Sequence, residues 1–301
     1  MKMAGINYAT QYSRELAQAF PYVLNFGALY STPNNGRYRI TGAKTIEIPH
    51  LSVTGRVNAD RDTLGAAARN YDNAWEPKTL TNQRKWSTLV HPADIDQTNE
   101  VASIANITKV MNEEQKFPEM DAYCISTLYK AWTSAPVSKT ADSTALTTAN
   151  ILAVFDNLML AMDEERVPVN GRILYVTNAV KTMLKQATAI NRSFDVKSGA
   201  NSRIDRTISR IEEVEVIGVP SELMKTEYDF TTGWKPKSNA KQINMFLVHP
   251  SAVITPVSYQ FATLDAPTAM TQGKYFYYEE SFEDVFILNN HAGALQFNIT
   301  A

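Results

Sequence analysis

The sequence predicts an α+β fold, because strand-like and helix-like patterns occupy separate stretches of its 301 residues. Polar and apolar residues alternate between positions 37 and 48, which is typical of half-exposed β-strands. Two sets of apolar residues between 101 and 132 recur at every third or fourth position, which is typical of an amphipathic helix. Residues 147–248 combine helical patterns with short apolar strands, and residues 252–299 read as β-strand. The chain therefore has an extended front part, a long helix and a mixed body.

Residues 1–33 are predicted to form an N-terminal arm. They contain one short helical candidate at 8–19, which is followed by Pro21, Gly27 and Pro33. The apolar side chains from Phe20 to Tyr30 show no regular period. We therefore expect the arm to bury its aromatic residues against another surface.

The next segment predicts a long two-stranded hairpin. Its first strand covers residues 37–48, and its returning strand lies within residues 79–90, where Trp86 begins a second alternating run. The polar stretch 55–77 between them is interpreted as an elaborated tip. Such a hairpin has too few apolar residues to fold alone, so we expect it to need a partner surface.

Residues 96–134 predict one long helix with an irregularity at Pro118, since proline is accommodated in a first helical turn and not in a helix interior. A second helix is expected at 147–166 and a third at 178–189, with a buried strand at 172–176 between them. A polar loop with a local excess of bases follows at 190–210. Further strands are expected at 214–219, 243–248, 253–261, 273–278, 284–288 and 294–299.

Charge and cysteine content exclude several classes of protein. The 29 basic and 31 acidic residues give a net charge of −2, whereas neutralising nucleic-acid phosphates requires a surplus of Lys and Arg. The single cysteine, Cys124, excludes an internal disulfide framework and a cysteine-based zinc site. The uncharged stretches 16–36 and 242–264 contain prolines and many polar side chains, so we expect a soluble chain without a membrane span.

No pattern of catalytic or ligand-binding residues stands out. The four histidines, His50, His91, His249 and His291, lack the short spacing of a metal site. Neither a Gly-x-Ser-x-Gly elbow nor a glycine-rich phosphate loop occurs. A Ser-His-Asp triad stays open, because its members need not be close in sequence. We nevertheless expect no enzyme and no catalytic, cofactor-binding or metal site.

Four segments carry a family resemblance through their order and spacing. Residues 117–123 read FPEMDAY and are similar to a "pE-DAy" stretch in a capsid spine helix. Residues 149–176 resemble the helix-turn-strand opening of an A domain, and 213–220 resemble the strand after the A-domain loop. Residues 275–287 resemble closing P-domain strands. Together they resemble the major capsid protein of tailed bacteriophages, which has the HK97-type fold.

The resemblance implies an HK97-like capsid fold with five parts. These are an N-terminal arm at 1–33, an E-loop at 34–95, a spine helix with the first part of the P domain at 96–139, an A domain at 140–248 and the C-terminal strands of the P domain at 249–301.

The resemblance also implies a function. A major capsid protein self-assembles through pentamers and hexamers into an icosahedral shell that encloses phage double-stranded DNA. It is assembled in the bacterial host cytoplasm and resides in the virion. The implied partners are further copies of itself, a separate scaffolding protein, a portal protein, decoration or head-completion proteins, and packaged DNA contacted without sequence specificity. No membrane partner is implied. An encapsulin-like compartment shell with a protein cargo stays open as an alternative, as does a cytosolic hydrolase.

Two features of the family are not expected here. The arm is short, so we expect no scaffolding segment that a protease removes. The sequence nominates no Lys–Asn pair for a covalent cross-link.

Opposite charges predict how two subunits meet. Residues 34–95 hold nine bases and six acids, whereas residues 265–284 hold one base and five acids. We predict that the E-loop of one subunit lies over the acidic strands of another, with charge selecting the register and apolar burial supplying the strength. Exchanging Glu279 and Glu280 for Lys is then expected to impair assembly without unfolding the subunit. The residues expected at this interface are Arg37, Arg39, Lys44, Arg84, Lys85, Glu279, Glu280 and Glu283.

Overall fold

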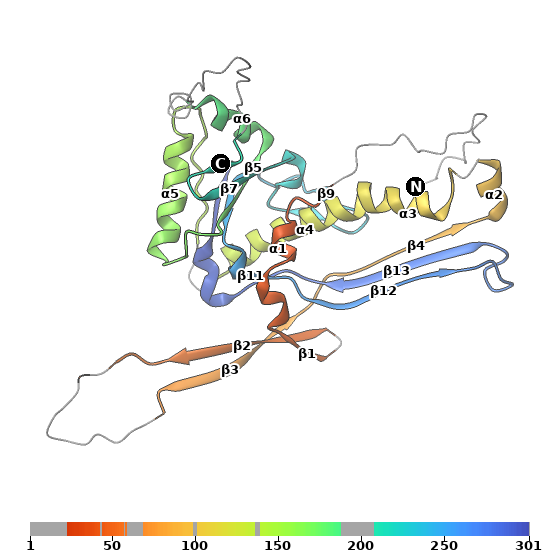
Figure 1. The fold of residues 1–301 in the computed structure, drawn as a ribbon, viewed down its shortest axis with the longest axis horizontal. Helices are drawn as coiled ribbons and strands as arrows, with labels where there is room; N and C mark the ends of the chain where they lie inside the picture. Colours follow the sequence, from red (N-terminus) through yellow and green to blue (C-terminus); the bar gives the residue numbers. More distant parts are fainter. Residues whose placement is uncertain are drawn as a thin grey trace, which may run out of the picture.

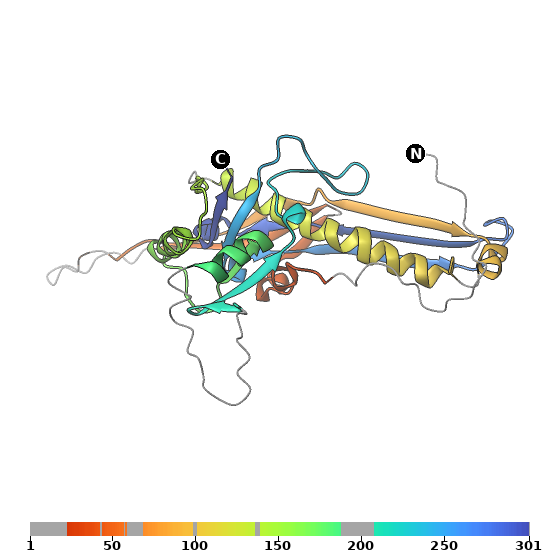
Figure 2. The same ribbon diagram turned by 90° about the horizontal axis from the view of Figure 1, so that it is seen from above.

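The computed structural model describes residues 23–42, 44–56, 58, 69–98, 101–135, 139–187 and 208–300. Figure 1 shows a compact α/β unit, a long helix, a sheet that runs alongside this helix, and a hairpin that projects away from both. Figure 2 shows from above that the helix follows the direction of the sheet's strands. The helix predicted at 8–19, the hairpin tip at 59–68 and most of the loop at 190–210 lie outside the described residues.

The α/β unit is built on a five-stranded sheet with the order β15-β10-β5-β7-β6. β5 and β7 are parallel, and the other neighbours are antiparallel. The strands are β5 (Ile173–Thr177), β6 (Arg210–Ile211), β7 (Val214–Val219), β10 (Ile243–Val248) and β15 (Leu295–Ile299). β15 comes from the end of the chain, which the resemblance places in the P domain, yet it pairs with β10.

Helices cover both faces of this sheet. α5 (Ile151–Glu164) and α6 (Asn178–Gln186) cover one face, where Leu174 and Val176 of β5 join their apolar core. α4 (Phe117–Thr133) covers the other face, where Tyr175 joins a second core. Alternate residues of β5 therefore point into different cores, and the whole strand is buried. A strand covered on both faces needs apolar residues at successive positions, which explains the continuous apolar run in the sequence.

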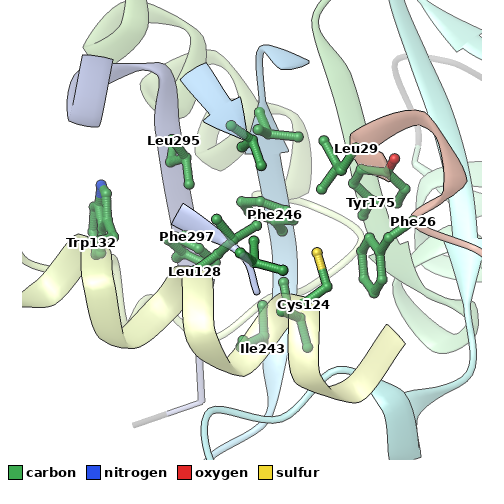
Figure 3. Close-up of a cluster of buried hydrophobic side chains, with 14 of the residues drawn as sticks. Phe26, Leu29, Cys124, Leu128, Trp132, Tyr175, Ile243, Phe246, Leu295 and Phe297 are labelled. Carbon is green, nitrogen blue, oxygen red and sulfur yellow. The ribbon is translucent and has the colours of Figure 1, made fainter. Parts of the chain in front are cut away.

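An aromatic cluster joins α4 to this sheet (Figure 3). The ring of Phe246 in β10 stacks on that of Phe297 in β15 with centroids 4.5 Å apart, and lies 5.8 Å from the ring of Tyr175. Phe26, from the segment before α1, lies 4.6 Å from Tyr175. The side chains of α4 in this core include three whose helical spacing predicted an apolar face: Cys124, Leu128 and Trp132. Ala122 and Ile125 of α4 join them.

The long helix, here called the spine helix, comprises α3 (Ile104–Met111), a π-helical turn η2 (Asn112–Lys116) and α4. In this turn the amide of Phe117 donates to the carbonyl of Asn112, five residues back. The turn directly precedes Pro118, which cannot donate and whose ring crowds the carbonyl of the preceding turn. The predicted irregularity is therefore a π turn inside a continuous helix. The first two residues predicted as helical, 96 and 97, instead end the separate α2 (Pro92–Gln97).

A three-stranded antiparallel sheet runs along the spine helix with the order β12-β13-β4. It contains β4 (Gln83–Val90), β12 (Val257–Asp265) and β13 (Tyr275–Glu283). The projecting hairpin consists of β2 (Thr45–Val53) and β3 (Tyr71–Thr79).

One sequence interpretation is wrong: Trp86 lies in β4, which pairs with β13, and not in the returning strand of the hairpin. The returning strand is β3, and most of it lies within the stretch interpreted as the tip. β3 contains Asp72, Asn73 and Pro77, which disfavour a central strand. However, β3 lies at the edge of its sheet, where a proline without a backbone N–H is tolerated.

Short elements complete the described part of the fold. They are α1 (Gly27–Tyr30), η1 (Pro33–Gly36), β1 (Arg39–Gly42), η3 (Ser221–Leu223), β8 (Tyr228–Asp229), β9 (Lys235–Pro236), η4 (Pro250–Ala252), β11 (Val253–Ile254), β14 (Phe286–Ile287) and η5 (Asn289–Ala294).

Candidate functional site

The first turns of α4 hold three distant parts of the chain together. The guanidinium of Arg84 in β4 donates to both carboxylate oxygens of Glu119, at 2.6 and 3.0 Å. Its third nitrogen donates at 2.6 Å to the carbonyl of Phe230 in the loop between β8 and β9. This two-pronged geometry is specific to arginine and fixes β4 against the spine helix.

Asp121, two residues further along α4, holds the N-terminal segment. Its side chain is fully buried. One carboxylate oxygen accepts from the backbone amide and the side-chain amide of Asn25 at 2.9 and 3.0 Å, and the other accepts from the amide of Phe26 at 3.0 Å. Asp121 therefore positions the chain where it enters the aromatic core.

Tyr123 connects α4 to the residues that follow β13. Its hydroxyl donates at 2.7 Å to Asp284, which also accepts from the backbone amide and hydroxyl of Thr81 at 2.7 and 3.1 Å. Burial, followed by the negative charge of Asp284, raises the pKa of Tyr123 well above its ordinary value. Tyr123 therefore remains a hydrogen-bond donor at every physiological pH.

A cavity of about 270 Å³ lies between the spine helix and the sheet. Lys116 lines this cavity, and its ammonium nitrogen lies 3.2 Å from a carboxylate oxygen of Glu279 in β13. Glu283 also lines the cavity. Burial raises the pKa of Glu283, and the charges of Glu119 and Asp284 raise it further against the opposing effect of Lys116. The folded protein therefore resists ionising this carboxyl group.

This raised pKa predicts a pH-dependent effect of Glu283→Gln. A carboxyl group whose pKa rises on folding, here from 4.5, costs stability as the pH increases through the raised value. We expect the variant to unfold at a higher temperature than the parent at pH 8 and at the same temperature at pH 4. Thermal unfolding at both pH values measures this, with Glu164→Gln on the exposed side of α5 as the control. An equal shift at both pH values would contradict the stated cause.

The projecting hairpin has one apolar side that the described chain leaves largely exposed. The paired positions Pro49 and Trp75, and Val53 and Tyr71, share this side with Leu51. The side chain of Val53 is 69% exposed and that of Leu51 is 63% exposed. The guanidinium of Arg39 lies over the Trp75 ring at 3.9 Å and bonds Glu47 at the base of the hairpin. We call the set Pro49, Leu51, Val53, Tyr71 and Trp75 the hairpin face.

The long sheet has an aromatic side that faces away from the spine helix. Phe261 is 44% exposed and pairs with Glu280, which pairs in turn with Lys85. At one end of this side, Phe282 is buried under Ile46 at the base of the hairpin. Beyond Phe282 the row of rings has no such cover within the described chain. We call the set Leu89, Tyr259, Phe261, Phe276 and Tyr278 the sheet face.

The structure separates the eight residues predicted at a subunit interface into two groups. Arg84, Glu279 and Glu283 face the spine helix, where Arg84 and Glu279 already have partners. Among the other five, Lys85 and Glu280 pair on the opposite side of the sheet, and Arg39 lies over Trp75 of the hairpin face. Arg37 follows η1, and Lys44 lies 5.9 Å from the ring of Phe282. The role of these five residues in an interface stays a prediction. Reversing Glu279 would set a cation beside Lys116 in this subunit, so it is not a variant that affects assembly alone.

Sequence reasoning missed the hairpin face and the roles of the FPEMDAY segment. Alternating Pro49, Leu51 and Val53 on the first strand indicate an apolar side. The sequence pattern, however, assigns the partner strand to residues 79–90, so it does not bring Tyr71 and Trp75 to that side. The functions of Glu119 and Asp121 have no local signal, because their partners lie 35 and about 95 residues away in sequence.

Within the described ranges, no cluster of three or more His, Cys, Asp or Glu side chains has the arrangement of a metal site. None of the described helices is both long enough and apolar enough to cross a bilayer.

Comparison with known proteins identifies the fold. No protein-family model and no curated protein matches the sequence. Solved structures do match over almost the whole chain. The capsid of cyanophage P-SCSP1u is 14% identical, with a TM-score of 0.66, and the match covers 97% of this chain and 93% of that one. The mature capsid of bacteriophage PhiM1 is 11% identical, with a TM-score of 0.65, covering 98% and 92% of the two chains.

The capsid of Helicobacter pylori bacteriophage KHP30, described as acid-stable, is 12% identical, with a TM-score of 0.62. That match covers 100% of this chain and 99% of the other. At such low sequence identity, a structural match over the full length shows a shared fold. It confirms the α+β fold that the resemblance implied. The chain therefore has the fold of the tailed-phage capsid proteins.

Proposed function

We propose that this chain is a major capsid protein, which assembles through pentamers and hexamers into an icosahedral shell around phage double-stranded DNA. In this proposal the protein has no enzymatic role. It is assembled in the host cytoplasm and resides in the virion. A separate scaffolding protein, a portal protein and head-completion or decoration proteins complete the particle, and the DNA is contacted without sequence specificity.

The observation that carries the proposal is the pair of uncovered apolar surfaces. The hairpin face projects from one end of the molecule, whereas the long sheet that bears the sheet face extends in the opposite direction (Figure 1). Two different surfaces on opposite sides of a subunit favour a head-to-tail contact, and such contacts form closed rings when the rotation between successive subunits closes. Isolated hairpins are marginal in water, so a neighbour that covers the hairpin face would also stabilise it.

We propose that the hairpin face of one subunit packs on the sheet face of the next. The basic residues Arg37 and Lys44 would then lie near Glu280, in keeping with the charge difference between the two segments. Exposed ion pairs contribute at most about 1 kcal/mol each, so burial of the aromatic side chains would provide most of the affinity.

Electron microscopy of the purified protein, with mass photometry alongside, tests this function. We expect rings of five and six subunits or closed shells, formed either spontaneously or with a co-expressed scaffolding protein. A small compact oligomer under both conditions would contradict the proposal.

A further inference from the structure

The cavity beside the π turn has walls of two chemical kinds. Gln115 and Lys116 of this turn both line the cavity. Apolar and aromatic walls come from Trp86 of the sheet and from Met111 and Tyr123 of the spine helix. The cavity thus joins an aromatic surface to charged groups, which is the usual composition of a small-molecule site.

The charged groups of the cavity do not balance. The cations Arg84 and Lys116 pair with Glu119 and Glu279. Two further carboxyl groups line the same space, those of Glu283 and Asp284. Lys85 and Glu280 also line it, so the lining has five acidic and three basic side chains. Asp284 is almost fully buried, and its oxygens accept from Tyr123, Thr81 and the amide of Val285.

Glu283 differs from Asp284 in its surroundings. It is half-buried at the cavity wall, and Lys116, the nearby cation that favours its ionised form, already contacts Glu279 at 3.2 Å. An additional cation in the cavity would offset the repulsion between Glu283 and its acidic neighbours.

We propose that this cavity binds an organic cation, with one ammonium or guanidinium group at Glu283 and a short apolar chain against Trp86 and Tyr123. The aromatic rings remove the apolar chain from water, and a carboxylate forms a charge-assisted hydrogen bond with the cationic group. A metal ion is disfavoured, because the described residues provide no three-ligand cluster. The cation is either a free diamine or a Lys or Arg side chain of a second copy of this chain.

Binding of 1,4-diaminobutane to the dilute, unassembled chain tests the site. Titration calorimetry and thermal unfolding at constant ionic strength should show saturable binding of the diamine, weaker binding of n-butylamine and none of 1-butanol. Glu283→Gln should weaken the diamine's affinity by at least about fivefold, because one charge-assisted hydrogen bond is lost. Trp86→Leu should also weaken it, while Glu164→Gln, which removes the same charge from α5, should leave it unchanged.

Absence of saturable binding, or equal affinity in the parent and in Glu283→Gln, would overturn the proposal. These measurements use the single chain, so they hold whether or not the protein forms shells. A second experiment, ring formation in the presence of the diamine, identifies the source of the cation. This experiment does rest on the proposed capsid function. If the diamine blocks ring formation in the parent but not in Glu283→Gln, the natural occupant is a neighbour's side chain. If rings form with the diamine bound, the occupant is a free diamine.

Discussion

Replacing Asp121 by alanine is expected to destabilise the subunit by about 3 kcal/mol, since the loss of a charged acceptor leaves buried donors unsatisfied. Its carboxylate accepts from both the backbone and side-chain amides of Asn25 and from the amide of Phe26, which lies fully buried against Tyr175. Alanine cannot supply an acceptor inside the helix–sheet core. Urea unfolding of the two proteins measures the change.

Two further variants sharpen this prediction. Asp121→Asn keeps one oxygen acceptor and is expected to cost less than Asp121→Ala. Asp156→Ala removes an acid from an exposed position of α5 and is expected to change stability by less than about 0.5 kcal/mol. Hydrogen exchange at the amides of Asn25 and Phe26 should accelerate in Asp121→Ala. A loss of stability without faster exchange there would contradict the anchoring role.

Leu51→Asp in the hairpin face is expected to prevent rings and shells while leaving subunit stability nearly unchanged. The side chain is 63% exposed in the single chain, so the substitution should change the free energy of unfolding by less than about 0.5 kcal/mol. In a contact with the sheet face, the same charge would be buried without a partner, which costs several kcal/mol. Mass photometry and electron microscopy measure assembly, and thermal unfolding measures stability.

The matched control is Ala74→Asp, which adds the same charge to the exposed opposite side of the same hairpin. It is expected to assemble. Phe261→Asp in the sheet face should fail to assemble, as Leu51→Asp does. An equimolar mixture of these two defective chains retains one intact contact, between the normal hairpin of one and the normal sheet of the other. It should therefore form pairs but no rings, and shells assembled from Leu51→Asp alone would refute the head-to-tail contact.

Local sequence patterns predict correctly those elements whose surroundings match the pattern. The predicted bounds of β7 and β10 agree with the structure. The spacing of Cys124, Leu128 and Trp132 identified the buried side of α4. These elements are covered by apolar neighbours along their length. The positions that are apolar in the sequence are therefore the positions that are buried in the structure. The α+β class and the capsid-like architecture followed from such elements and their order.

Strand pairing and the partners of the charged side chains depend on the packing of distant segments, which local patterns do not contain. The alternation of β4 fits any partner strand equally well, so it does not identify β13 as the neighbour. It also does not identify Glu119 of the spine helix as the partner of Arg84. β3 has no clear strand pattern, because an edge strand tolerates Pro77 and because most of its side chains are exposed and need not be apolar.

The same limit applies to the interface residues. Glu279 and Glu280 are adjacent in sequence, yet they point to opposite sides of one sheet, and only Glu279 contacts Lys116. Neighbouring positions of a strand alternate between its two faces. Which of the two faces lies against the spine helix is determined by the packing of the sheet on that helix and not by the sequence of the strand.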